Sequence, residues 1–431
     1  MNKNILHLAI PNIISNITVP LLGMVDMYVV GHLDSEYYIG AIALAAMLFN
    51  LIYWSFSFLR MGTSGFTAQA FGADNPQEEI NILCRSLAVA LFLGFMILIL
   101  QSLISFVGFK FLDGGVEVKK YALDYFRIYI WAAPAILSMY AFNGWFVGMQ
   151  NAKVPMFVAI GINIVNIGLC FFFVYVLDMR IEGVALASVC AQYTGLLCTL
   201  IIWSFQYKEM KKYIDLNILK NISSFRPFFN VNKDIFIRTM ALIAVSTFFL
   251  SASAKLGDDI LAVNALLMQF FILFSYMMDG FAYAAEALTG RFIGANDRVQ
   301  LKILVRKLFL WGAGIAIGFT LIYGLFTDQI LSLLTDKSQI IALCKEYQWW
   351  VLFIPIAGFS AFLWDGIFIG ATASKQMRNS MLIAATAFFI IYFIFNIYLL
   401  NNILWFSFTL YLAIRGIVQT FMSRSILNES K

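Results

Sequence analysis

The chain has 431 residues, of which 61% are hydrophobic and 12% are charged, with a formal net charge of +5. Soluble globular chains are typically about half apolar and about a quarter charged, so this composition excludes an ordinary soluble domain and indicates an integral membrane protein. The five cysteines lie in or beside apolar segments without metal-ligand spacing. We interpret them as small packing residues rather than as a metal site.

Apolar segments long enough to cross a membrane follow one another along the chain, separated by short polar connections. A helix needs about 20 apolar residues to cross a hydrocarbon core of about 30 Å. Because several segments exceed this length, we expect tilted or kinked helices. The N-terminus lacks the features of a signal peptide, so we expect the first segment to be retained. We predict an all-α integral membrane protein with twelve transmembrane helices, at residues 5–31, 38–70, 82–112, 121–149, 154–177, 181–207, 231–255, 260–290, 302–335, 340–370, 379–400 and 403–426.

The first segment carries one acid, Asp26, within the apolar stretch VPLLGMVDMYVVG. A charge at the centre of a membrane helix costs about 2.5–3.5 kcal/mol on insertion scales, which makes such a residue a functional candidate. Burial disfavours the charged form of a carboxyl group. Asp26 is therefore suited to carry a proton, or to bind sodium if neighbouring oxygens complete its shell. Pro11 and Pro20 remove backbone hydrogen bonds from the same helix and predict a bend near the acid.

The sequence repeats itself at a constant spacing. The stretch FNGWFVGMQNAK, which contains Gly144, aligns with WDGIFIGATASK, which contains Gly366, and we call the separation of these two glycines the repeat spacing. The stretches AQAFGADN and TGRFIGAND align at the same spacing through Gly72 and Gly294, and we expect them to be helix ends where glycine allows the turn. An offset of six spans preserves topology. The pattern therefore predicts two parallel six-helix repeats, an arrangement typical of secondary transporters.

A basic connection separates the two repeats. The densest cluster of basic residues lies between Lys208 and Arg238. Cytoplasmic loops carry an excess of Lys and Arg, so we place this connection and both termini in the cytoplasm. We interpret the cluster as a determinant of topology that also attracts anionic lipid, and nothing in it supports binding to nucleic acid. The predicted domains are a six-helix lobe at 1–207, a basic cytoplasmic connection at 208–230, and a second six-helix lobe at 231–431.

Four stretches resemble the multidrug and toxic compound extrusion (MATE) transporters, in particular their DinF-like branch. They are FLRMGTSGFTAQAFGADN, GWFVGMQNAKVP, AYAAEALTGRFIGA and WDGIFIGATASKQMRNSM. The resemblance covers essentially the whole chain. It implies two six-helix lobes in a V around a cleft, exporting bulky and often cationic compounds against an inward flow of protons or sodium ions. Asp26 matches the acid of the family's first helix, and Pro11 matches a proline that precedes this acid by fifteen residues.

The resemblance also implies polar partners for Asp26. The family carries an Asn and, four residues later, an Asp in its fifth helix, and a Thr in its sixth. Aligning on GVALAS places Asn166 at the Asn position and Ser188 at the Thr position, whereas Cys170 stands where the second acid is expected. Asn163 is an alternative choice for the amide. A sodium site would centre on Asp26 and Asn166, but the missing acid weakens the sodium interpretation and favours protons.

The second lobe supplies three further acids: Asp279, Glu286 and Asp365. Glu286 and Asp365 lie in the stretches that match the family best. These acids are candidates for binding a cationic substrate or for ion coupling. The alternative is that each pairs with a base inside the membrane, for which Arg60 and Arg415 are the candidates.

The leading hypothesis is a secondary active transporter, not an enzyme: an ion-coupled antiporter, with protons favoured over sodium, that exports bulky, often cationic drugs. We expect small-molecule, mainly cationic or amphipathic substrates, contact with membrane lipid, no nucleic-acid partner, no cofactor besides the coupling ion, and a monomer. The alternative is a flippase for lipid-linked glycans, which usually needs a cationic cavity. An intramembrane enzyme would need a nucleophile–base pair or metal ligands within its spans. We place the chain in the cytoplasmic (inner) membrane of a bacterium.

Overall fold

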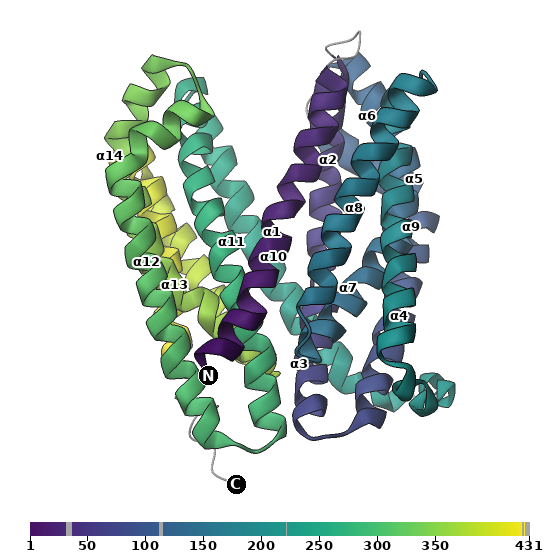
Figure 1. The fold of residues 1–431 in the computed structure, drawn as a ribbon. Coiled ribbons are helices and arrows are strands. Elements are labelled where there is room, and N and C mark those ends of the chain that lie inside the picture. Colours follow the sequence, from purple (N-terminus) through teal and green to yellow (C-terminus); the bar gives the residue numbers. More distant parts are fainter. Residues whose placement is uncertain (32–36, 112–114, 221, 425, 427–431) are drawn as a thin grey trace. The chain divides into compact units, whose positions relative to one another are not determined.

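The computed structural model describes residues 1–31, 37–111, 115–220, 222–424 and 426, and the described residues contain helices and no β-strand (Figure 1). Twelve helical stretches of this part of the chain are long and apolar enough to cross a membrane, which confirms the predicted fold class. The α-helices before the central connection are α1 (Asn2–Gly31), α2 (Tyr37–Ser55), α3 (Phe58–Gly72), α4 (Pro76–Ile99), α5 (Gln101–Phe111), α6 (Val116–Tyr129), α7 (Ala133–Gly148), α8 (Lys153–Phe171) and α9 (Ile181–Gln206).

After the connection follow α10 (Arg226–Lys255), α11 (Asp258–Gly294), α12 (Arg298–Leu334), α13 (Ser338–Gly370) and α14 (Ser374–Met422). The last helix contains two of the predicted spans. They meet at Leu400, whose φ of 43° and ψ of −118° interrupt the helix. The connection itself consists of three short 3-10 helices, at Lys208–Tyr213, Leu216–Lys220 and Ile222–Phe225.

The two aligned helix ends adopt the same turn. Asp74, with φ 49°, precedes the cap residue Asn75, whose side chain accepts a hydrogen bond from the Glu78 amide at 3.1 Å. The equivalent turn places Asn296 at φ 54° before Asp297, which caps α12 in the same way. The residue in the left-handed conformation is thus Asp or Asn, both of which tolerate it, and not the glycine that the sequence suggested.

The aligned glycines make equivalent contacts in the two repeats. A side chain at Gly144 would collide with the carbonyl oxygen of Arg60, and one at Gly366 would collide with that of Ala282. Arg60 and Ala282 are themselves separated by the repeat spacing. The small residues therefore let α7 approach α3, and α13 approach α11, to backbone contact, as in other membrane helix pairs. These contacts show the predicted repeat in three dimensions.

We expect Gly144→Ala and Gly366→Ala each to lower the stability by about 1–3 kcal/mol or more, because the added methyl group meets backbone that cannot rotate away. Gly314→Ala on α12 is the matched control, since nothing lies within 4 Å of its added methyl group. Alanine also favours helix over glycine, so this control should unfold at the same temperature as the parent or slightly above it. Thermal unfolding in detergent measures both effects. If all three variants unfold at the same temperature, the close helix contact is contradicted.

The helices form two compact units. The first-repeat unit contains Ile14–Phe229, and the second-repeat unit contains Met1–Ile13 together with Asn230–Lys431. The units match the predicted lobes except in two places: the start of α1 groups with the second repeat, and the connection groups with the first. Gln77 of α4 holds the connection by donating to the Tyr213 carbonyl at 2.8 Å. The boundaries of the predicted lobes stay a prediction.

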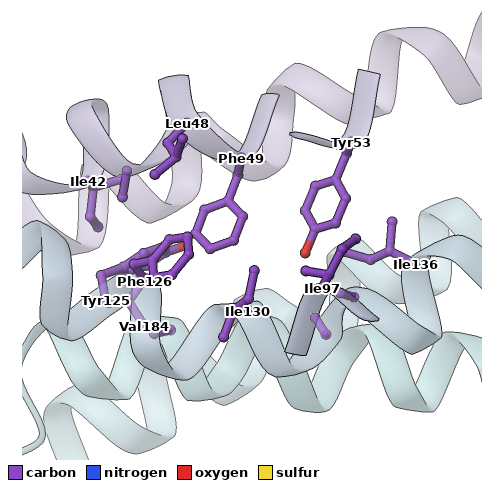
Figure 2. Close-up of a cluster of buried hydrophobic side chains, with 14 of the residues drawn as sticks. Ile42, Leu48, Phe49, Tyr53, Ile97, Tyr125, Phe126, Ile130, Ile136 and Val184 are labelled. Carbon is purple, nitrogen blue, oxygen red and sulfur yellow. The ribbon is translucent and has the colours of Figure 1, made fainter. Parts of the chain in front are cut away.

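Aromatic and aliphatic side chains fill the core of the first-repeat unit (Figure 2). Phe49 of α2 stacks on Phe126 of α6 with ring centroids 5.1 Å apart, and Tyr53 continues the row along α2. This core extends to Val29 and Val30 near the end of α1. The polar residues of the same region therefore lie in an environment of low polarity, in which charges and hydrogen bonds act strongly.

Candidate functional site

Asp26 lies in the last third of α1, and only 6% of its surface is exposed. The following turn of the helix contributes Val29 and Val30 to the apolar core. α1 continues as one helix through Pro11 and Pro20, so both prolines lie inside it. A moving bend at either proline stays a prediction.

Three helices bring polar side chains together at this acid. The Cys170 thiol of α8 donates to Asp26 Oδ1 at 3.6 Å, and its sulfur is also 3.7 Å from Asn166 Oδ1. Asn166 Nδ2 in turn donates to Ser188 Oγ of α9 at 2.8 Å. All four side chains are buried. The structure thus groups the three predicted ion-coupling residues, Asp26, Asn166 and Ser188, around Cys170; their role in coupling stays a prediction.

The spacing of buried residues on α8 explains this grouping. Val154, Val158, Ile162, Asn166 and Cys170 are buried and recur every four residues, so they form one face of the helix. The apolar members fix which face of α8 turns inward. The amide and the thiol at the end of the same face are then carried into the core beside α1.

The alternative amide, Asn163, has a different partner. Its Nδ2 donates to the carbonyl oxygen of Thr18 at 2.8 Å, about two helical turns before Asp26. Asn163 therefore ties α8 to the backbone of α1, whereas Asn166 belongs to the cluster at the acid. Which of the two amides takes part in coupling stays a prediction.

Two tyrosines of α6, Tyr125 and Tyr129, complete the surroundings of Asp26. Both interact electrostatically with its carboxylate, and Tyr125 is hydrogen-bonded to Ser188. These phenols carry no charge near neutral pH. Among the described residues no basic side chain forms an ion pair with Asp26, so a negative charge here lacks a counter-ion.

The residues present do not fit a sodium ion well. Sodium is a hard cation, and such ions are bound by several oxygen ligands. Besides the carboxylate of Asp26, the cluster offers the amide oxygen of Asn166 and the hydroxyl oxygens of Ser188 and the two tyrosines, but where the resemblance implies a second acid it offers a sulfur. The sulfur of Cys170 is a soft ligand that suits other metals. Within the described residues, no group of three or more His, Cys, Asp or Glu side chains could hold a metal ion.

Asp365 of α13 is held by two arginines. Arg238 of α10 and Arg415 of α14 both form ion pairs with Asp365 Oδ2, while Gln419 Nε2 donates to Oδ1 at 2.6 Å. Each of these side chains is buried. Because both carboxylate oxygens are engaged, the pairing alternative describes Asp365 better than the binding of a cationic substrate.

Arg238 corrects one part of the sequence interpretation. The sequence groups it with the basic residues around the connection, and only Arg60 and Arg415 are named as bases inside the membrane. Arg238 instead lies in the middle of α10, 9% exposed, and binds Asp365. Its position within the apolar stretch DIFIRTMALIA was the available signal.

The other two acids of the second-repeat unit lie on α11. Glu286 is 1% exposed, and its backbone carbonyl packs against Gly370 of α13. Asp279 is half-buried and interacts electrostatically with Arg415. Asp279 therefore lies near one of the two arginines that hold Asp365. A role of either acid in substrate binding or coupling stays a prediction.

The positions of the second repeat that correspond to the Asp26 cluster hold aromatic residues. Shifted by the repeat spacing, Asp26, Asn166 and Cys170 correspond to three aromatic residues, Phe248, Phe388 and Tyr392. Their rings pack together edge-on. The ring centroid of Phe248 lies 5.9 Å from that of Phe388 and 5.1 Å from that of Tyr392. Equivalent positions of the two repeats thus hold a polar cluster in one unit and packed rings in the other.

A family model, MatE, matches the chain twice, at residues 11–172 and at residues 235–398. The chain belongs to the MatE family. The starts of the two matches, and likewise their ends, are separated by nearly the repeat spacing, in agreement with the internal repeat.

Individual relatives of this MatE chain support the family assignment. It is 38% identical over 420 residues to the DNA damage-inducible protein F of Escherichia coli (strain K12), a match that covers 96% of this chain and 90% of that protein. A probable multidrug resistance protein NorM from Thermotoga maritima is 20% identical over 355 residues, covering 80% of this chain and 75% of that protein.

Solved structures show the same fold. A MATE structure in the bent conformation matches with a TM-score of 0.87 at 21% identity, covering 99% of this chain and 95% of that one. A multidrug resistance MATE family transporter in the outward-facing conformation matches with a TM-score of 0.85 at 20% identity, covering 99% of this chain and 97% of that one. MatE proteins are transporters of small molecules, generally ion-coupled antiporters, and not enzymes. This MatE chain is accordingly a multi-pass membrane transporter.

Sequence reasoning missed a second ion pair of this MatE chain. Asp234 of α10 is buried and accepts from Arg378 Nη1 at 2.5 Å and from Ser374 Oγ at 2.9 Å, at the start of α14. Asp234 lies in the basic region beside the connection, and the two partners lie in the family-matching stretch SKQMRNS. Only the folded structure shows that these residues bind one another and thereby hold α10 against α14.

Proposed function

We propose that this chain is a proton-coupled antiporter that exports bulky, often cationic small molecules. The observation that carries the proposal is Asp26, a buried carboxyl group without a basic partner among the described residues. Such a group is stable when protonated and costly when charged, because little water or countercharge compensates it. Proton uptake and release at Asp26 can thereby favour one of two helix arrangements over another.

The division of α1 supports a role for its prolines in this cycle. Met1–Ile13 group with the second-repeat unit and the rest of α1 with the first-repeat unit, and Pro11 lies two residues before this boundary. Pro11 and Pro20 each leave one backbone carbonyl of the helix without its usual donor, which eases bending. We propose that α1 bends in this region when Asp26 changes its protonation state.

The names of relatives support export of toxic compounds. The Thermotoga maritima relative is named a probable multidrug resistance protein, and one of the matching structures is a multidrug resistance transporter. The glycan flippase hypothesis gains no support from these comparisons. The high aromatic content, 16% of the chain, together with 18 methionines, suits binding of flat and cationic compounds. Glu286 and Asp279 remain candidates for the charge that attracts such substrates.

We place the chain in the inner membrane of a bacterium, in keeping with its Escherichia coli relative, with both termini in the cytoplasm. The excess of Lys and Arg in the central connection supports this orientation. One chain carries both repeats, so we expect a monomer to be the working unit.

The decisive experiment measures uptake of a cationic dye into inside-out vesicles, driven separately by a pH gradient and by a sodium gradient of the same size. We expect uptake with the pH gradient, collapse of uptake when a protonophore removes that gradient, and no uptake with sodium alone. Vesicles without the transporter are the control. Uptake driven by sodium alone would contradict proton coupling, and no response to either gradient would contradict ion-coupled export.

A further inference from the structure

One thiol lies between two acceptors in the Asp26 cluster. The Cys170 sulfur is 3.6 Å from Asp26 Oδ1 and 3.7 Å from Asn166 Oδ1, distances at which a thiol can donate to either oxygen. A thiol carries one proton and can therefore donate to one of them at a time. Cys170 is fully buried, so water does not compete for this proton.

Which oxygen receives the thiol proton depends on Asp26. An ionised carboxylate accepts much better than a neutral amide, so the thiol donates to Asp26 while Asp26 is charged. When Asp26 takes up a proton, its oxygens lose that advantage and the thiol can turn to the amide oxygen of Asn166. The thiol keeps its own proton throughout, and the only proton gained is the one on Asp26.

We propose that Cys170 is the positioning residue that makes this site specific for protons. The proposal rests on the proposed function. A thiol directed at Asp26 places a hydrogen atom where a metal ion would need an oxygen ligand, and it uses the Asn166 oxygen when Asp26 is protonated. The same thiol transmits the state of Asp26 on α1 to Asn166 on α8, and through Asn166 Nδ2 to Ser188 on α9.

The other groups around Asp26 are compatible with this role. The titratable groups that act on it are Tyr125 and Tyr129 of α6 and Cys170 of α8. Ser188 of α9 adds a neutral hydroxyl. None of these described partners carries a charge near neutral pH, so a substitution at position 170 changes the proton affinity of Asp26 directly.

The first arm of the test removes the donor. With Cys170→Ala, the charged state of Asp26 loses a stronger hydrogen bond than the protonated state does, so Asp26 holds its proton more tightly. A hydrogen bond is worth about 0.5–1.5 kcal/mol, so the pH profile of dye transport in proteoliposomes should move upward by about 0.5–1 unit. Cys170→Ser, which keeps a donor, should restore the profile of the parent. Cys344→Ala is the matched control, because Cys344 is equally buried but lies on α13 in the other unit.

The second arm adds an oxygen ligand. With Cys170→Asp, two carboxylates adjoin, and we expect sodium to raise the melting temperature of the detergent-solubilised variant in a saturable way, with no such effect in the parent. If this variant does not fold, the pH profiles of the first arm decide. A Cys170→Ala profile identical to those of the parent and Cys344→Ala would overturn the proposal, as would a folded Cys170→Asp variant without a sodium response. Failure of the parent to respond to a pH gradient would instead overturn the proposed function.

Discussion

Replacing Asp365 with asparagine is expected to destabilise the second-repeat unit by about 3–5 kcal/mol, the typical effect of removing one partner from a buried ion pair. Asp365 neutralises Arg238 and Arg415, and all three side chains lie inside membrane-spanning helices. An amide removes the counter-ion that both arginines share and leaves Arg415 with the electrostatic interaction of Asp279. The ion pairs that hold α10, α13 and α14 together would then be replaced by a repulsion between two buried positive charges.

Thermal unfolding in detergent and the yield of folded protein measure this effect. Asp328→Asn is a matched control, since Asp328 forms an exposed pair with Lys345 in the same unit, and exposed pairs contribute little. A variant without charges, Asp365→Leu with Arg238→Met and Arg415→Met, should recover most of the lost stability. If Asp365→Asn is stable but binds cationic dyes poorly, Asp365 binds substrate and the pairing is secondary.

Asp26→Asn is expected to abolish transport driven by a pH gradient while leaving folding and substrate binding largely intact. Asparagine has nearly the shape of a protonated aspartate but does not titrate. The neutral amide also removes the cost of burying a charge, so insertion should not suffer. Without a group that takes up and releases a proton, the gradient can no longer favour one helix arrangement over the other.

The measurement compares dye uptake in vesicles with dye binding to the purified variant. Asp124→Asn on α6 is the matched control in the same unit. Asp124 is partly exposed, and its Oδ1 is 3.9 Å from Arg127 Nη1. The control should transport at the rate of the parent. An Asp26→Asn variant that still pumps against a concentration gradient would show that Asp26 is structural, and Glu286 and Asp279 would then be the next acids to test.

The sequence was sufficient for the features that depend on local composition. Apolar length alone predicts the spans, because the membrane requires about 20 apolar residues per helix. The repeat was visible because tight helix contacts need glycine at Gly144 and Gly366, which keeps the matching stretches recognisable. Asp26 was prominent for a similar reason: a single acid in an apolar stretch is rare enough to indicate a role.

Pairings between distant helices were much harder to predict. Asp365 and Arg238 are 127 residues apart in sequence, and Asp234 and Arg378 are 144 apart. Neither stretch identifies its partner, because the first ion pair depends on how α10, α13 and α14 pack and the second on how α10 packs against α14. Cys170 differs from these pairs, because the resemblance already implied that it lies beside Asp26 and Asn166, and the structure adds that its thiol is within donor distance of both oxygens.

The packed rings of Phe248, Phe388 and Tyr392 have a thermodynamic consequence for the proposed antiporter. With rings in the place of a second acid cluster, the proposed coupling through Asp26 alone would move one proton per turnover. A pH difference of one unit then supplies about 1.4 kcal/mol, which by itself supports roughly a tenfold accumulation ratio. Exchange of one proton for a singly charged cation moves no net charge, so the membrane voltage adds nothing. Exchange for a neutral compound moves one charge and gains about 2.3 kcal/mol per 100 mV.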